Sequence, residues 1–200
     1  MELHTRDLTS VGMKVRFDRS QWQEVRPPSP AALLVLANTP GGGYPTLTIV
    51  LEPAGDSLPL SELSRWRERL LRSYAGVGLS GLQIASLKTF KLQGAVAALR
   101  ATVHFAKGDT AYLAEVLTLY RGENLVHITE VFRAGGAQDT ESAFSNFLDG
   151  LEFSDAYRAL RTNTMTSPAL PSLPFLIFAC SLPLLGIAAI VFFLRARKSR

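Results

Sequence analysis

The longest regular alternation of apolar and polar positions runs from residue 82 to residue 133. It predicts four consecutive strands, at Leu82–Leu92, Ala95–Phe105, Ala111–Arg121 and Leu125–Arg133. The connections between them are short and rich in Gly and polar residues, which is typical of hairpins. The pattern therefore predicts an antiparallel meander as the centre of the fold.

A register can be assigned by pairing Leu92 with Ala95, Phe105 with Ala111, and Gly122 with Leu125. Side chains alternate across a strand, so each pairing decides which residues share a face. One predicted face is apolar and should be covered by helices; it holds Leu82, Ile84, Phe90, Leu92, Leu99, Val103, Phe105, Leu113, Leu117, Leu119, Val126, Ile128 and Phe132, with Ser86, Lys88, Glu115 and Glu130 as polar members.

The opposite face is predicted to be amphiphilic, and either partly covered or used for contact. Its members are Arg100, Thr102, His104, Tyr112, Val116, Thr118, Tyr120, His127, Thr129 and Val131. The candidate partner-binding residues come from this face and are Arg100, His104, Tyr112, Tyr120 and His127. The same register separates His104 from His127 by about 26 Å, too far for a shared metal or proton.

Shorter patterns flank the meander. Further strands are predicted at Val11–Phe17, Ala31–Ala37 and Thr46–Leu51, and amphipathic helices at Leu60–Tyr74 and from about Asp139 to Leu151. Apolar residues fall on one side of each helix at helical spacing. The predicted class is α+β, with a central antiparallel sheet of about six or seven strands packed by two or more helices. This domain is expected to span residues 1–154.

The C-terminal part of the chain has a different composition. Residues 155–172 are polar and then rich in proline, and are predicted to form a linker. Residues 173–194 carry no charge and as a helix would extend about 33 Å, enough to cross a bilayer core of about 30 Å. We expect a single transmembrane helix there, followed by a basic tail at residues 195–200 with Arg195, Arg197, Lys198 and Arg200 as its membrane flank.

The orientation of this span rests on two opposing arguments. The positive flank favours a cytoplasmic tail and a domain on the outer side. The first ten residues, however, contain no apolar stretch of a secretory signal, so the whole domain would need another route across. We predict a tail-anchored protein of the bacterial inner membrane with its domain in the cytoplasm; the alternative places the domain on the outer side.

Charge and cysteine content exclude several classes of function. The net charge of +4 comes from the basic tail, and the remaining residues carry equal numbers of basic and acidic side chains. A neutral domain lacks the basic surface that nucleic-acid binding requires, so no nucleic-acid partner is expected. Cys180 is the single cysteine, which excludes a disulfide or a thiolate metal site within one chain.

Two glycine-rich motifs are similar to parts of known cofactor sites. Gly41-Gly42-Gly43 is not followed by Lys and Ser or Thr, and it precedes a predicted strand. Residues 76–81 match G-x-G-x-x-G, but they follow a helix and open a strand, whereas a dinucleotide site requires the reverse order. No cofactor is therefore predicted.

Glu115 and Glu130 are the best candidates for acid–base catalysis. The assigned register makes them diagonal neighbours on the apolar face, within reach of a shared partner such as Lys88 or Arg133. Paired carboxylates can exchange protons with a substrate, although an ordinary ion pair is the more common explanation. No catalytic triad, metal-ligand spacing or phosphate-binding loop is present, so no catalytic or metal-binding residue is predicted.

The order of elements resembles the PsbP-like fold, which is shared by Mog-type and DcrB-like proteins. The stretches that carry the resemblance are Gly12–Phe17 leading to Trp22, and the closing segment Phe144–Phe153. The resemblance covers about residues 8–154 and implies an antiparallel sheet between helices, mostly without catalytic activity. Members of this superfamily act as accessory or partner-binding modules, and some bacterial relatives are chaperones for transmembrane segments of secreted effectors.

We therefore expect a membrane-anchored, non-enzymatic accessory or adaptor protein whose domain binds a protein partner. One alternative is a chaperone-like module for apolar helices of secreted effectors, which requires an exposed apolar groove. A second alternative is a small hydrolase or isomerase that uses Glu115 and Glu130.

Overall fold

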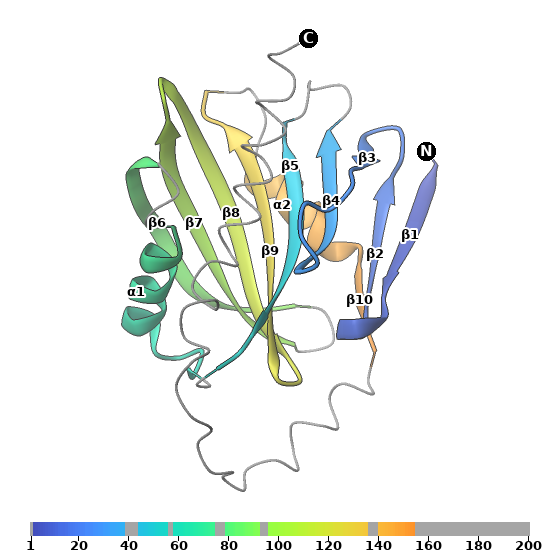
Figure 1. Ribbon diagram of the computed structural model, residues 1–200, viewed down its shortest axis with the longest axis horizontal. Coiled ribbons are helices and arrows are strands. Elements are labelled where there is room, and N and C mark those ends of the chain that lie inside the picture. Colours follow the sequence, from blue (N-terminus) through green and yellow to red (C-terminus); the bar gives the residue numbers. More distant parts are fainter. Residues whose placement is uncertain are drawn as a thin grey trace, which may run out of the picture.

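The computed structural model describes residues 2–38, 44–55, 58–74, 79–92, 96–135 and 140–154. These residues form ten strands, a short 3-10 turn and two α-helices (Figure 1). In chain order the elements are β1 (Leu3–Leu8), η1 (Thr9–Val11), β2 (Met13–Asp18), β3 (Trp22–Glu24), β4 (Ala32–Asn38), β5 (Thr46–Pro53), α1 (Leu63–Tyr74), β6 (Ser80–Lys91), β7 (Ala97–Lys107), β8 (Thr110–Arg121), β9 (Asn124–Arg133), α2 (Thr140–Asp149) and β10 (Leu151–Phe153).

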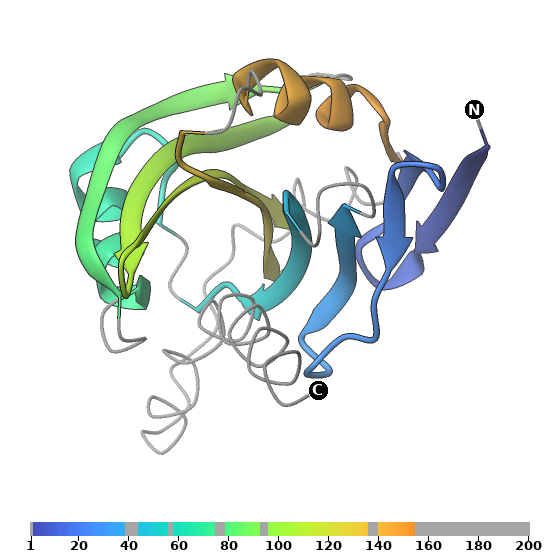
Figure 2. The same ribbon diagram turned by 90° about the horizontal axis from the view of Figure 1, so that it is seen from above.

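The strands are arranged in two sheets. The large sheet has seven strands in the order β3-β4-β5-β9-β8-β7-β6 and is strongly curved (Figure 2). The small sheet has the order β1-β2-β10. All strand pairs of the described residues are antiparallel. The predicted α+β class with an antiparallel sheet is confirmed, whereas the small sheet, with β1 and β10, was not predicted.

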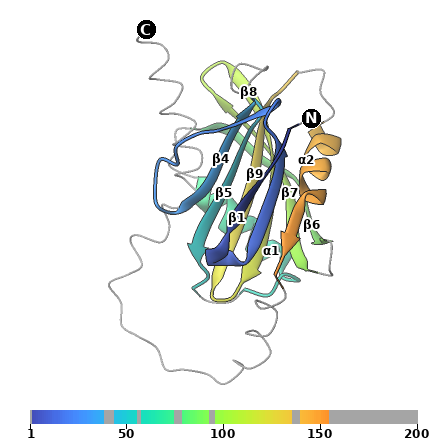
Figure 3. The same cartoon turned by 90° about the vertical axis from the view of Figure 1, so that its right-hand side faces the viewer.

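One face of the large sheet, here called the α2 face, is covered by α2 and the small sheet. Figure 3, viewed from the side of the small sheet, shows α2 leading directly into β10. Phe144, Phe147 and Leu148 of α2 are buried, as the sequence predicted. They share one core cluster with Val11, Met13, Val15 and Phe17 from the small-sheet region, and with Leu34, Leu36, Leu47, Ile49, Leu117, Leu119, Val126 and Ile128 of the large sheet.

The opposite face, here called the α1 face, is covered in part by α1. Leu70 and Tyr74 of this helix pack with Val103 and Val116 of the sheet. Trp66 is fully buried, and its Nε1 donates a hydrogen bond to the carbonyl oxygen of Pro59 at 3.0 Å. The apolar side predicted for this helix therefore contacts the sheet, as expected from its spacing.

The register predicted between the second and third meander strands is wrong. Phe105 pairs with Tyr112 rather than Ala111, because the loop contains only Gly108 and Asp109 between paired Lys107 and Thr110. A slip of one residue moves every side chain of a strand to the other face. Leu99, Val103 and Phe105 therefore lie on the α1 face, while Arg100, Thr102 and His104 lie on the α2 face.

The other two predicted pairings are also shifted, by one and by two residues. Phe90 pairs with Ala98 and Lys91 with Ala97, one residue away from the register set by pairing Leu92 with Ala95. Leu125 pairs with Tyr120 rather than Gly122, a shift of two residues that leaves both faces as predicted. An irregularity between Ile84 and Ser86 of β6 changes the register within that strand. Ile84 therefore pairs with Val103 on the α1 face, whereas Lys88 pairs with Arg100 on the α2 face.

Arg121, a buried residue at the end of β8, forms hydrogen bonds that link the small sheet to the large one. Its Nε donates to the carbonyl oxygen of Val11, and one terminal nitrogen donates to those of Gly12 and Ser154, at 2.9, 2.9 and 3.4 Å. The guanidinium also lies over the Phe153 ring, 5.2 Å from its centroid. One side chain thus connects the large sheet to the turn before β2 and to the end of β10.

The predicted domain boundary, linker, span and basic tail concern residues 155–200, which lie outside the described residues. Among the helices that the structure describes, none has the length and apolar character needed to cross a membrane. The predicted transmembrane helix at 173–194 therefore stays a prediction.

The Gly108-Asp109 turn yields a stability prediction. Gly108 has φ of +57°, and a Cβ added there would meet no atom within 4 Å, so any cost of Gly108→Ala is conformational. We expect Gly108→Ala to lower the free energy of unfolding by about 1 kcal/mol. Gly108→Asn should lose less, because Asn tolerates the left-handed region better than Ala. Urea unfolding of the three proteins measures this; equal stability of wild type and Gly108→Ala would contradict it.

Candidate functional site

The five candidate partner-binding residues do not form one exposed surface. Arg100 and His104 lie on the α2 face, while Tyr112, Tyr120 and His127 lie on the α1 face. His104 is exposed, and the other four are buried. The predicted common face is wrong because of the one-residue slip between β7 and β8. A role of these residues in partner binding stays a prediction.

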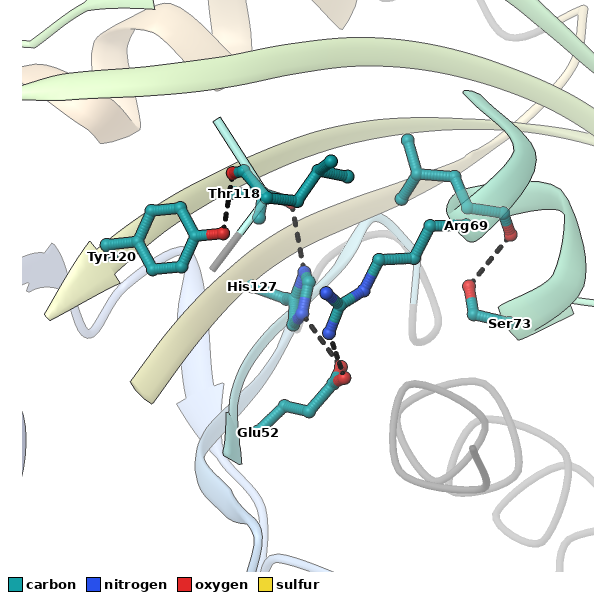
Figure 4. Close-up of polar contacts among 8 residues, drawn as sticks. Glu52, Arg69, Ser73, Thr118, Tyr120 and His127 are labelled. Carbon is teal, nitrogen blue, oxygen red and sulfur yellow. Dashed lines mark hydrogen bonds and ion pairs between the residues drawn. The ribbon is translucent and has the colours of Figure 1, made fainter. Parts of the chain in front are cut away.

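His127 instead belongs to a polar network on the α1 face (Figure 4). Its Nδ1 lies 3.0 Å from Thr118 Oγ1 on β8, and its Nε2 lies 3.1 Å from Glu52 Oε2 on β5. The other Glu52 oxygen accepts a hydrogen bond from Arg69 of α1 at 2.6 Å. A chain of contacts thus runs from the sheet through His127 and Glu52 to the helix.

The order hydroxyl, imidazole, carboxylate is that of a catalytic triad. Thr118, however, is only 2% exposed, so its hydroxyl lies where a substrate could not reach it. The network instead links α1 to the sheet, next to Tyr120, whose hydroxyl donates to the carbonyl oxygen of Leu58 at 2.7 Å. The arrangement is that of a satisfied buried polar network, which fixes one packing of the helix.

Glu52 was not recognised from the sequence because it lies 75 positions before its partner His127. The pairing of β5 with β9 brings them together, with Val50 directly opposite His127. Burial alone would raise the pKa of Glu52, but the hydrogen bonds and charges of His127 and Arg69 outweigh it. The pKa of Glu52 is therefore below its ordinary value, and the carboxylate form is favoured.

A second polar cluster lies on the α2 face. Glu115 and Glu130 share this face as predicted, but they are directly opposite rather than diagonal. The partner of Glu115 is Arg100, neither Lys88 nor Arg133: Arg100 Nε lies 3.1 Å from Glu115 Oε2, and Thr102 Oγ1 donates to Glu115 Oε1 at 2.8 Å. Arg100 lies there because of the corrected register of β7.

The two carboxyl groups differ in their surroundings. Glu115 has the hydrogen bonds just described, whereas Glu130 Oε2 is buried with no hydrogen-bond partner. Burial and the nearby charge of Glu115 raise the pKa of Glu130 to about 8. A pair with one ionised and one protonated member is suited to proton exchange. Glu115 and Glu130 are only 4% and 1% exposed, however, which leaves them inaccessible to a substrate in this structure.

An open pocket of about 470 Å³ lies where the small sheet meets β3. Its lining residues are His4 of β1, Phe17 of β2, Arg19, and Trp22, Gln23 and Glu24 of β3. The His4 and Phe17 rings meet edge to face with centroids 5.3 Å apart. This volume falls in the range of ligand-binding pockets. Sequence reasoning missed the pocket because β1 was not predicted and Trp22 was assigned to a loop.

Charged side chains flank this pocket in two ion pairs. Arg6 Nε lies 3.6 Å from Glu24 Oε1, and a terminal nitrogen of Arg19 lies 3.6 Å from Glu2 Oε1. All four side chains are at least a third exposed, so these pairs contribute little to stability. Within the described part of the chain, no group of three or more His, Cys, Asp and Glu residues is arranged to hold a metal ion.

Comparison with known proteins identifies the fold. No family model matches the sequence, and the search of curated proteins gave no match. Among solved structures, the chain is similar to cyanobacterial PsbP (CyanoP) from Synechocystis sp. PCC 6803, with 14% identity and a TM-score of 0.57 over 76% of this chain and 93% of that one.

Two more of the similar solved structures come from other organisms. A protein from Bacteroides thetaiotaomicron VPI-5482 has 14% identity and a TM-score of 0.52 over 77% of this chain and 49% of that one, so the match spans about half of that protein. The Ran-binding protein Mog1p of Saccharomyces cerevisiae has 14% identity and a TM-score of 0.47 over 81% and 90%. The resemblance suggested by the sequence is confirmed at the level of fold: the described residues have a PsbP-like fold.

The contacts of Glu52 predict that the stability of the folded domain depends on pH. Because the pKa of Glu52 is lowered on folding, its contribution to stability is present above its ordinary pKa of 4.5 and is lost as pH falls through the lowered value. At pH 7, Glu52→Gln should reduce the free energy of unfolding by on the order of 2 kcal/mol. Denaturant unfolding at several pH values tests this.

The exposed Glu68→Gln on α1 is the matched control and should behave like wild type. Wild type and Glu52→Gln should converge in stability as pH falls below 4.5. A difference between them that stays constant from pH 7 to pH 3 would contradict the proposed ionic role of Glu52.

Proposed function

We propose that this protein is a non-enzymatic accessory or adaptor protein that binds a protein partner through its PsbP-like domain. In this proposal the apolar segment at residues 173–194 holds it in a membrane, with the domain on the cytoplasmic side. The observation that carries the binding function is the open pocket between β1, β2 and β3, with the part-exposed Trp22 in its wall.

The composition of this pocket is that of a protein-binding surface. Trp and Arg are the residue types most often found where a few side chains dominate the free energy of association. Phe17 supplies a buried apolar floor, and the ion pairs Arg6–Glu24 and Arg19–Glu2 lie at the rim. Such exposed charges can pair with a partner and set its orientation at little cost. The pocket therefore combines an apolar centre with a polar rim, the usual anatomy of an interface.

The position of the pocket suits a tethered domain. The backbone N–H of Ser154, the last described residue, donates a hydrogen bond to the carbonyl oxygen of Gly12, next to Met13 at the start of β2. Phe17, which lines the pocket, lies four residues further along this strand, about 13 Å away. A linker continuing from Ser154 would therefore begin at the end of β2 opposite to the pocket.

Two rival functions receive less support. For a chaperone of apolar helices an exposed apolar groove is needed, but among the described residues Leu3 is the one large apolar side chain that is exposed. For a hydrolase or isomerase, the direct pairing of Glu115 with Glu130 and the raised pKa of Glu130 are favourable. The burial of both carboxyl groups on the α2 face counts against that function.

Partner capture tests the binding proposal. Full-length protein purified from native membranes should carry a stoichiometric protein partner, and Trp22→Ala should reduce its recovery at least about tenfold, the loss expected on removing a dominant side chain. Leu3→Ala is the control, since Leu3 is 59% exposed and does not line the pocket. Circular dichroism confirms that each variant is folded. Recovery of the same partner with Trp22→Ala would show that this pocket is not the binding surface, and absence of any partner would weaken the adaptor function itself.

Protease treatment of intact spheroplasts tests the orientation. With the domain in the cytoplasm, residues 1–154 should resist digestion until the cells are lysed. Digestion of the domain without lysis would show that it lies on the outer side. Release of the protein by salt or carbonate, without detergent, would contradict the transmembrane helix.

A further inference from the structure

The polar cluster on the α2 face has an imbalance of charge. Arg100, Glu115 and Glu130 are all buried on the α2 face of the large sheet. Two carboxyl groups therefore face one guanidinium in a region largely shielded from water. Like charges that share a buried site cannot both ionise without a large free-energy cost, so one of the carboxyl groups should keep its proton.

The hydrogen bonds identify which carboxyl group is ionised. Both oxygens of Glu115 accept hydrogen bonds, one from Arg100 Nε and one from the Thr102 hydroxyl, which itself accepts a hydrogen bond from Ser86 Oγ at 3.0 Å. Glu130 is 1% exposed, and its Oε2 has no hydrogen-bond partner. An ionised carboxylate is stabilised by donors, so Glu115 carries the negative charge and Glu130 the proton.

The neighbouring elements supply no other buried cation among the described residues. Lys88 of β6 and His104 of β7 face this side but are exposed. Arg121 of β8 is six residues from Glu115, about 20 Å along the strand, and is bonded to backbone carbonyls.

The remaining neighbours are apolar or exposed. Leu47 of β5 is paired with Glu130, and the side chains that the small sheet buries in the core of this face, Met13, Val15 and Phe17, are apolar. On α2, Asp149 is exposed, and the side chain of Glu141 lies outside the described residues.

Arg100 connects this cluster to α2. Its terminal nitrogen lies 3.4 Å from Ser145 Oγ of the helix, and its guanidinium lies over the Phe144 ring, 5.4 Å from the centroid. On the other side it lies 5.8 Å from the centroid of the Phe90 ring. The same guanidinium therefore neutralises Glu115 and helps to hold α2 on the sheet.

We propose that the Glu115–Glu130 pair and Arg100 form a proton-dependent latch for α2. With Glu130 protonated, Arg100 contacts Glu115 and α2 at the same time, and the helix stays packed on the sheet. Loss of the Glu130 proton creates a second buried negative charge, which competes for Arg100 and draws water beneath the helix. The helix then opens locally while the rest of the sheet keeps its structure.

The direction of the pH effect follows from the raised pKa of Glu130. In the unfolded chain this group ionises at about pH 4.5, and in the folded domain at about pH 8. Between these values the folded state binds more protons, so its stability falls as pH rises. Opening of α2 is therefore expected at mildly alkaline pH and not in acid.

Hydrogen exchange of the full-length protein in detergent micelles tests the latch. From pH 7 to pH 9.5, and after correction for the intrinsic exchange rate, protection of amides in Phe144–Leu148 should fall at least about tenfold, the change expected for one pH unit beyond the pKa. Amides of Leu70–Tyr74 in α1 serve as an internal reference and should keep their protection. In Glu130→Gln the α2 amides should stay protected over the whole range.

Matched variants separate the latch from general alkaline loosening. Glu68→Gln, an exposed substitution on α1, should retain the wild-type response. Equal loss of protection in α1 and α2, or the same loss in Glu130→Gln as in wild type, would overturn the proposal. If Glu130→Gln does not fold, carbon-13 titration of the wild-type glutamate carboxyls decides: the latch requires one that titrates near pH 8, and it fails if all finish below pH 6.

Discussion

The central strands β8 and β9 of the large sheet carry polar side chains although both of their faces are buried, and much of the structure follows from this constraint. A buried polar group is tolerated only when other groups satisfy it, so these side chains form two clusters on opposite faces. On the α1 face, Glu52 connects His127 and Thr118 to Arg69. On the α2 face, Arg100 connects Glu115 to Ser145. Each helix is thus positioned by a specific polar contact in addition to apolar packing.

Burial of both faces also explains which parts of the fold the sequence could predict. The strands of the meander, the two helices and the antiparallel class are visible in the periodicity. The register between β7 and β8 is not, because Leu99 and Val103 on one face and Ala98 on the other are all buried, so apolar character does not distinguish the faces. The two-residue turn at Gly108 decides the register. A five-residue connection was predicted there instead, and this assigned the side chains of β7 to the wrong faces of the sheet.

The candidate sites were harder to predict, for a related reason. The pairing of Glu115 with Glu130 involves adjacent strands and was recognised apart from its offset. The contact of Glu52 with His127 depends on β5 lying beside β9, a pairing between strands far apart in the sequence. The pocket at Trp22 depends on two separate sheets, and no local pattern places β1 near β3. Local periodicity therefore predicts the elements, while long-range pairing creates the sites.

The contacts of Arg121 have a mechanical consequence. The chain leaves the described domain at Ser154, directly after the short strand β10, which pairs antiparallel with β2. A pull on the chain beyond Ser154 would load the hydrogen bonds between β10 and β2. Arg121 bonds the carbonyl oxygens of Ser154, Val11 and Gly12 at once, so it would pass part of this force to β8 in the centre of the large sheet. Tension at the C-terminal exit would therefore act on β10 and, through Arg121, on β8 before it acts on α2.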